Sequence, residues 1–268
     1  MMNIGDQIKA ADWRQGCLFR RADLQAMYGV PLSDNEFAIV LSQSCDLVHH
    51  SLDSEPTIEI VIATAIYECA GQYTFAKHSR RLHIEISAVD GATRPVEIVP
   101  HARHFLPREP LAVLTPDPGL FLLDEARSVL TNWLAGRYTR AALPDEFNRR
   151  INIANNKKAK KAASRLSKHV SGLYVDIHPF DEIAADDHYT VNLLALVPQR
   201  YADERHAIET SAEAIAELMR DHNMDVTVAV RSENNVPVSL MRAFQQLDFD
   251  ALSLKSDPPD PLPPARPA

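Results

Sequence analysis

The chain has 268 residues, of which 46% are hydrophobic and 24% are charged, and its net charge is −8. This composition is ordinary for a globular protein, and the length can bury one large core or two modest ones. The negative charge argues against a surface that binds nucleic acid everywhere, but it is compatible with a local basic face. Only 8 glycines accompany 18 prolines, which argues against a glycine-rich phosphate-binding fold.

Export and membrane signals are not evident in the sequence. No apolar stretch approaches the ~20 residues that span a bilayer, and the N-terminus lacks a basic start followed by an apolar segment. We therefore expect a cytoplasmic, bacterial-type protein with no membrane partner. The three cysteines, Cys17, Cys45 and Cys69, are widely spaced, and without an export signal they are expected to be reduced thiols.

Residues 1–115 are expected to form a small β-barrel or sandwich. Apolar, β-branched or alternating runs predict strands at residues 37–41, 57–62, 82–86, 96–99 and 111–114. Asp90-Gly91 lies between two of these runs and is a hairpin signal. The short strands and their proline-containing turns favour an SH3-like barrel.

Residues 116–170 change to helical periodicity and become basic. Apolar spacing predicts a helix from Leu122 to a stop at Gly136, and Pro144 with its following carboxylates predicts a second helix start. Positive charge then gathers within about twenty residues, at Arg149, Arg150, Lys157, Lys158, Lys160, Lys161, Arg165 and Lys168.

Residues 171–255 are expected to form a ferredoxin-like α/β unit. Strands are predicted at residues 173–177, 189–197 and 224–230, and an amphipathic helix at residues 204–222. The tail at residues 256–268 is rich in proline and aspartate and is expected to be disordered. The fold class is therefore α+β, with a barrel, a central helical segment and an α/β sandwich.

The first buried strand is followed at once by Cys45 and Asp46, which form the first candidate site. A thiol at a helix start can have a lowered pKa, and His49 lies four residues further on. The alternative is a small buried cysteine with Asp46 closing a turn. Zinc binding is a further possibility, since Cys45, His49, Cys69 and His78 are suitable ligands, although their spacing is loose and includes no Cys-x-x-Cys or His-x-x-x-His pair.

Phosphodiester cleavage is the enzymatic hypothesis. Asp46 or His78 would act as the base, and Arg80 or Arg81 would stabilise the developing phosphate charge. Residues 77–83 form a compact cationic patch around these groups. The alternative interpretation of this patch is a solvated loop.

The basic run is the candidate nucleic-acid site. Six of its cations, namely Arg149, Arg150, Lys157, Lys158, Lys160 and Lys161, are expected to contact phosphates of RNA or DNA. A solvated helix face or a dock for an acidic protein partner are the alternatives. Just upstream, Arg137, Tyr138 and Arg140 form a possible recognition surface, whereas Trp133 is more typical of a core.

Two short motifs in residues 5–115 resemble the MazF/PemK family of toxin and regulator barrels. Gly5-Asp6-Gln7-Ile8 resembles the family's strand start, and Val40-Leu41-Ser42 resembles its later strand that ends in serine. The resemblance implies a small barrel. The Arg-Pro pair that this family usually has before the second motif is absent, so the resemblance does not extend to its ribonuclease activity.

These patterns together predict a nucleic-acid-associated protein of a toxin, defence or regulatory kind, with phosphodiesterase or ribonuclease activity as its enzymatic form. The competing hypothesis is a non-catalytic protein-interaction module or a zinc-stabilised binding domain. The sequence indicates no particular cofactor.

Overall fold

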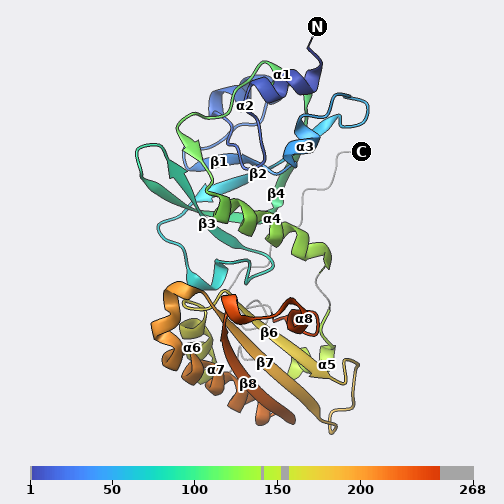
Figure 1. Ribbon diagram of the computed structural model, residues 1–268, viewed down its shortest axis with the longest axis vertical. Coiled ribbons are helices and arrows are strands. Elements are labelled where there is room, and N and C mark those ends of the chain that lie inside the picture. Colours follow the sequence, from blue (N-terminus) through green and yellow to red (C-terminus); the bar gives the residue numbers. More distant parts are fainter. Residues whose placement is uncertain (1, 140–141, 152–156, 248–268) are drawn as a thin grey trace. The chain divides into compact units, whose positions relative to one another are not determined.

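A computed structural model describes residues 2–139, 142–151 and 157–247 (Figure 1). The chain divides into two compact units. Unit 1 comprises Met1–Cys69 and Arg81–Leu134, and unit 2 comprises Ala70–Arg80 and Ala135–Ala268. The central helical segment expected at residues 116–170 is therefore shared between the units, and the tail expected to be disordered lies outside the described residues.

Unit 1 is built on a curled antiparallel sheet that forms a half-barrel. Its five strands are arranged in the order β1-β2-β4-β3-β5. They comprise β1 (Glu36–Val40), β2 (Thr57–Ala65), β3 (Leu82–Ala88), β4 (Thr93–Pro107) and β5 (Leu120–Phe121). The predicted hairpin joins β3 to β4, where Gly91 has a φ of 87° that only glycine adopts without strain.

Two helices that the sequence did not predict lie in unit 1, α1 (Ile4–Ala10) and α2 (Arg21–Tyr28), and a third, α3 (Ser44–Leu47), begins just before Cys45, where a helix start was considered. Helices this short are marginal on their own, so their stability comes from packing. Ile8 of α1 and Leu24 of α2 are completely buried with Ile58 and Ile60 of the sheet. The motif that resembled a MazF/PemK strand start, at residues 5–8, therefore lies in α1.

Two further predictions are wrong. The strand expected at residues 111–114 overlaps a 3-10 helix at Glu109–Ala112, in which buried Leu111 faces the core and Pro110 supplies no N–H for a ladder. Gly136 does not end a helix but lies inside α4 (Asp124–Thr139), because a glycine stops a helix only where the backbone turns left-handed.

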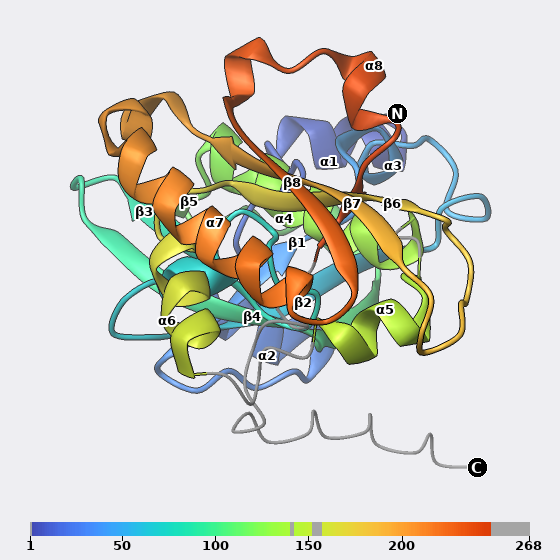
Figure 2. The same cartoon turned by 90° about the horizontal axis from the view of Figure 1, so that it is seen from below.

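Unit 2 contains a second sheet, of order β8-β7-β6-β9, with helices on one face (Figures 1 and 2). Its strands are β6 (Gly172–His178), β7 (Tyr189–Val197), β8 (Met224–Ser232) and β9 (Gln245–Gln246). The strands β7 and β8 are parallel and are joined by α7 (Arg205–Arg220), whereas β6 is antiparallel to β7. The α+β class is confirmed, but these orders do not confirm the SH3-like and ferredoxin-like layouts.

The remaining helices of unit 2 are short. They comprise α5 (Asp145–Arg150), α6 (Lys157–Leu166), α8 (Val238–Met241) and 3-10 helices at Gly71–Tyr73, Gln199–Glu204 and Glu233–Asn235. Alternate residues of β6, β7 and β8 point into one core, which also takes up Phe147 of α5, Leu166 of α6 and Ile215 of α7. This core fixes which face of α6 is left for solvent.

Candidate functional site

The loop after β1 (residues 42–51, the Cys45 loop) carries the first predicted site. Cys45 is exposed, and its Sγ lies 3.5 Å from Gln43 Oε1 and 3.3 Å from Asp46 Oδ1. His49 is engaged elsewhere, because its Nδ1 lies 3.2 Å from the backbone nitrogen of Ser51. The described contacts therefore place a carboxylate beside the thiol but do not pair Cys45 with His49.

The Cys45 loop is shaped by Arg108, which follows β4 and is completely buried. Its guanidinium donates to four backbone carbonyls of the loop, those of Asp46 at 3.0 Å, Leu47 at 2.9 Å, His49 at 2.7 Å and Ser51 at 2.8 Å. Burial lowers the pKa of this guanidinium, which nevertheless stays protonated because arginine begins so high. The loop is thus a turn wrapped around a cation.

A second residue on which the Cys45 loop depends is Gly5 in α1. A Cβ at this position would collide with the carbonyl oxygen of Val48, so only glycine lets α1 cross the loop so closely. Neither Gly5 nor Arg108 was singled out from the sequence for this role. No local pattern marks an arginine whose partners lie about sixty residues away.

The cationic patch at residues 77–83 is largely buried, so its interpretation as a solvated loop is wrong for Lys77, His78 and His83, which are 1%, 2% and 7% exposed. Lys77 Nζ donates to the carbonyls of Ser167 and Val170 just beyond α6. Burial, with a smaller contribution from Arg200, lowers the pKa of Lys77 to about 7.

The proposed catalytic groups are divided between the two units. Asp46 and Arg81 belong to unit 1, whereas His78 and Arg80 belong to unit 2. Within unit 1, Arg81 lies 3.5 Å from Glu97, which also contacts His83. Within unit 2, Arg80 is exposed and its backbone nitrogen donates to His78 Nδ1 at 3.1 Å. Each unit therefore holds one of the two alternative bases and one of the two alternative charge stabilisers.

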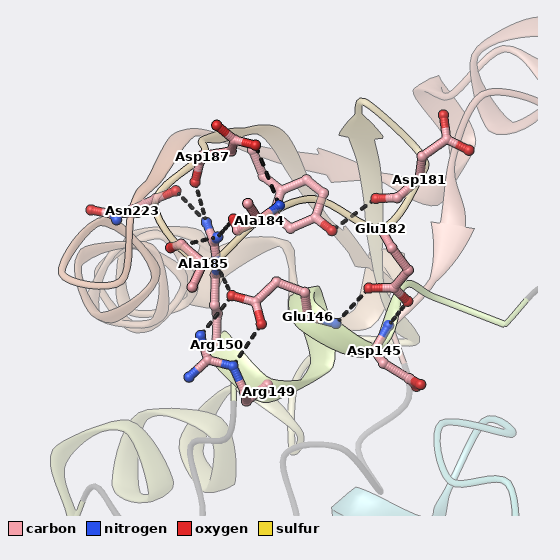
Figure 3. Close-up of polar contacts among 11 residues, drawn as sticks. Asp145, Glu146, Arg149, Arg150, Asp181, Glu182, Ala184, Ala185, Asp187 and Asn223 are labelled. Atoms are coloured by element: carbon pink, nitrogen blue, oxygen red, sulfur yellow. Dashed lines mark hydrogen bonds and ion pairs between the residues drawn. The ribbon is translucent and has the colours of Figure 1, made fainter.

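The two arginines of α5 are engaged in the fold of unit 2 (Figure 3). Arg150 is 5% exposed and donates to the carbonyls of Asp187 at 2.8 Å, Asn223 at 3.0 Å, Ala184 at 3.0 Å and Ala185 at 3.1 Å. Its Nε also donates to Glu146 at 2.7 Å. We therefore do not assign a phosphate contact to Arg150.

Arg149 is exposed but is held by the same carboxylate. Two of its nitrogens donate to Glu146, each at 2.6 Å. These bonds, together with that from Arg150, lower the pKa of Glu146 to about 2. Glu182 caps α5 by accepting from the backbone nitrogens of Asp145 and Glu146, so the start of this helix is firmly held (Figure 3).

The cations of α6 and of the turn after it are exposed to solvent, unlike the buried Arg150. Ala162, Ala163 and Leu166 are buried in the core, and the cations on the remaining side of the helix face solvent. We call the exposed cations the α6 basic face; they are Lys157, Lys158, Lys160, Lys161, Arg165 and Lys168. Within the described part of the chain, no carboxylate forms an ion pair with Lys157, Lys160, Lys161, Arg165 or Lys168.

The remaining residues singled out from the sequence are Trp133, Arg137, Tyr138 and Arg140. Trp133 is 3% exposed, which confirms it as a core residue, whereas Tyr138 is 76% exposed. Arg137 donates to the carbonyl of Ser79 at 3.2 Å, and Arg140 lies outside the described residues.

Among residues 2–139, 142–151 and 157–247, no three His, Cys, Asp or Glu side chains converge to hold a metal ion. No helix in these ranges is both long and apolar enough to cross a bilayer.

Comparison with known proteins adds no relative to this picture. No protein-family model, curated protein or solved structure matches the chain. The geometry described above is therefore the basis for assigning a function.

Proposed function

We propose that this chain is a nucleic-acid-associated protein that contacts the phosphate backbone through the α6 basic face, without reading base sequence. The observation that carries the proposal is the set of exposed cations on and just after one helix, five of which form no ion pair within the described residues. Such cations neutralise phosphates and release the counterions condensed on the nucleic acid.

The arrangement of charge on α6 supports binding over a merely solvated face. Lys157 and Lys161 are four residues apart, as are Lys161 and Arg165, so like charges adjoin along the helix. Each such pair destabilises a helix by about 0.2–0.5 kcal/mol. A row of phosphates beside the helix relieves this repulsion, whereas solvent only screens it.

Binding is favoured over cleavage because the predicted catalytic groups are held by contacts within the fold. The backbone of the Cys45 loop is held by Arg108, His78 is buried, and Arg81 lies 3.5 Å from Glu97, so these groups are engaged in the fold. A toxin, defence or regulatory role, as expected from the sequence, is compatible with such a binding module. An acidic protein partner would use the same cations and is the outcome that the experiment below distinguishes.

The test is a salt titration of binding to a generic single-stranded RNA and a generic duplex DNA, followed by fluorescence anisotropy. We expect affinity to fall steeply between about 50 and about 200 mM salt. The double variant Lys160→Gln/Lys161→Gln should reduce the slope of log affinity against log salt by about 1.4 on single strands and about 1.8 on duplex. A flat response in the unmodified chain would contradict the proposal.

The matched control removes the same charge elsewhere. Lys9 and Arg242 are exposed cations outside α6, so Lys9→Gln/Arg242→Gln changes the net charge equally. We expect the control to keep the original salt slope and both variants to keep the melting temperature. Equal losses of affinity in the two variants would show a diffuse charge effect and would overturn the assignment to α6.

A further inference from the structure

The strand β8 is the end strand of the sheet in unit 2, and β7 is its only strand neighbour among the described residues. Two arginines of α7 show which way its backbone points. Arg220 donates to the carbonyl of Val226 at 2.8 Å and 3.2 Å, and Arg205 donates to that of Val230 at 3.4 Å. These carbonyls point to the edge away from β7. Because the backbone groups of a strand alternate in direction, the N–H and C=O of Val228 between them point to the same edge.

A groove of about 740 Å³ runs beside this open edge. One wall comes from α7, including Arg205, Glu209 and Glu213, and the other comes from the second half of β8, including Val228 and Val230. The edge therefore offers the backbone of Val228, carbonyls of Val226 and Val230 that accept only from arginine side chains within the described residues, and adjacent space for the side chains of an added strand. Addition of a strand to an exposed sheet edge is a recurrent mode of association.

The sequence of β8 is complementary to itself in the antiparallel direction. Asp225 and Arg231 each lie three residues from Val228, on opposite sides of it, and both are exposed. They share the sheet face opposite to the valines that line the core. Neither forms an ion pair within the described residues, so both charges are available to a second copy there.

We propose that β8 pairs antiparallel with β8 of a second copy of this chain, about a two-fold axis at Val228. In this register Asp225 of each copy faces Arg231 of the other, giving two symmetric ion pairs. A two-fold axis makes the interface self-complementary and closes it at a dimer. The two sheets then form one continuous sheet, which removes the exposed edge.

Backbone alternation agrees with this register. Val226, Val228 and Val230, whose backbone groups point to the open edge, form the hydrogen-bonded pairs about the axis. Asp225 and Arg231 fall in a non-hydrogen-bonded pair, where side chains approach most closely. A carbonyl has two acceptor positions, so Arg205 and Arg220 keep their bonds when the second strand arrives. A register centred on Val226 would instead place Asp225 opposite Thr227 and leave Arg231 without a partner.

The test measures the mass of the full chain in solution by light scattering or sedimentation. We expect twice the 29.9 kDa of one chain. The variants Asp225→Arg and Arg231→Asp place like charges opposite each other, so each should weaken the dimer at least tenfold. The charge-exchanged double variant, Asp225→Arg/Arg231→Asp, restores the pairs and should restore the dimer.

Each other result overturns the proposal. A mass equal to that of one chain at every concentration would exclude the dimer. A dimer that persists in both single variants would show that the chains associate through another surface. A double variant that stays monomeric, with an unchanged melting temperature, would exclude the Asp225–Arg231 register.

Discussion

The helices α5 and α6 carry neighbouring parts of one basic run, yet their cations have opposite environments. Arg150 of α5 is buried among four backbone carbonyls, whereas the lysines of α6 face solvent. Arg108 in unit 1 repeats the α5 arrangement around the Cys45 loop. A guanidinium presents five donors in a planar fork, which suits it to gathering carbonyls from several directions, whereas a lysine is a compact point charge. Positive charge in a sequence can therefore hold a loop together or bind a phosphate, and burial decides between these roles.

The strongest test of this contrast is Arg108→Met. The substitution leaves four carbonyls of the Cys45 loop without their donor in a buried site. We expect a loss of about 3–5 kcal/mol in the free energy of unfolding, measured by urea denaturation. The control is Arg94→Met, since Arg94 is exposed near the start of β4, and it should be close to neutral. An equally small effect at Arg108 would show that the Cys45 loop keeps its conformation without the guanidinium.

The next test compares the two adjacent arginines of α5. We expect Arg150→Met to cost about 2–4 kcal/mol, because it strips four carbonyls and Glu146 of a buried donor. Arg149→Met removes only an exposed pair with the same carboxylate and should change stability little. Equal costs, in the same denaturation experiment, would mean that burial does not separate these residues.

The last test follows a slope with pH and concerns Lys77, a buried lysine that donates to two carbonyls as the arginines do. Its pKa is lowered from 10.5 to about 7, so between these pH values the unfolded chain binds more protons than the folded chain. Stability therefore rises with pH across this window, by at most about 1.4 kcal/mol per pH unit, and is at its lowest below the folded pKa. Denaturation at several pH values should show this rise. Lys77→Met should flatten it, and an unchanged slope in that variant would assign the rise to other groups.

Strand and helix patterns in the sequence were informative where burial repeats with a fixed period. The strands β7 and β8 and the helix α7 were predicted close to their observed bounds, because their alternate or helical positions enter one core. The short helices α1 and α2 were missed, since seven or eight residues give little periodicity and their stability is tertiary. Within the candidate site, the lysines of α6 were identified correctly as exposed, but Arg150 and Lys77 could not be distinguished from them by composition.

By itself the sequence determined the α+β class, most of the strands and the position of the basic run, because these follow from local periodicity and composition. Only the tertiary structure decided which cations are available to a partner. That outcome depends on carbonyls supplied by distant segments, such as residues 46–51 for Arg108 and residues 184–187 and 223 for Arg150. Burial of a charge is decided by the groups that surround it after folding, and no window of neighbouring residues contains them.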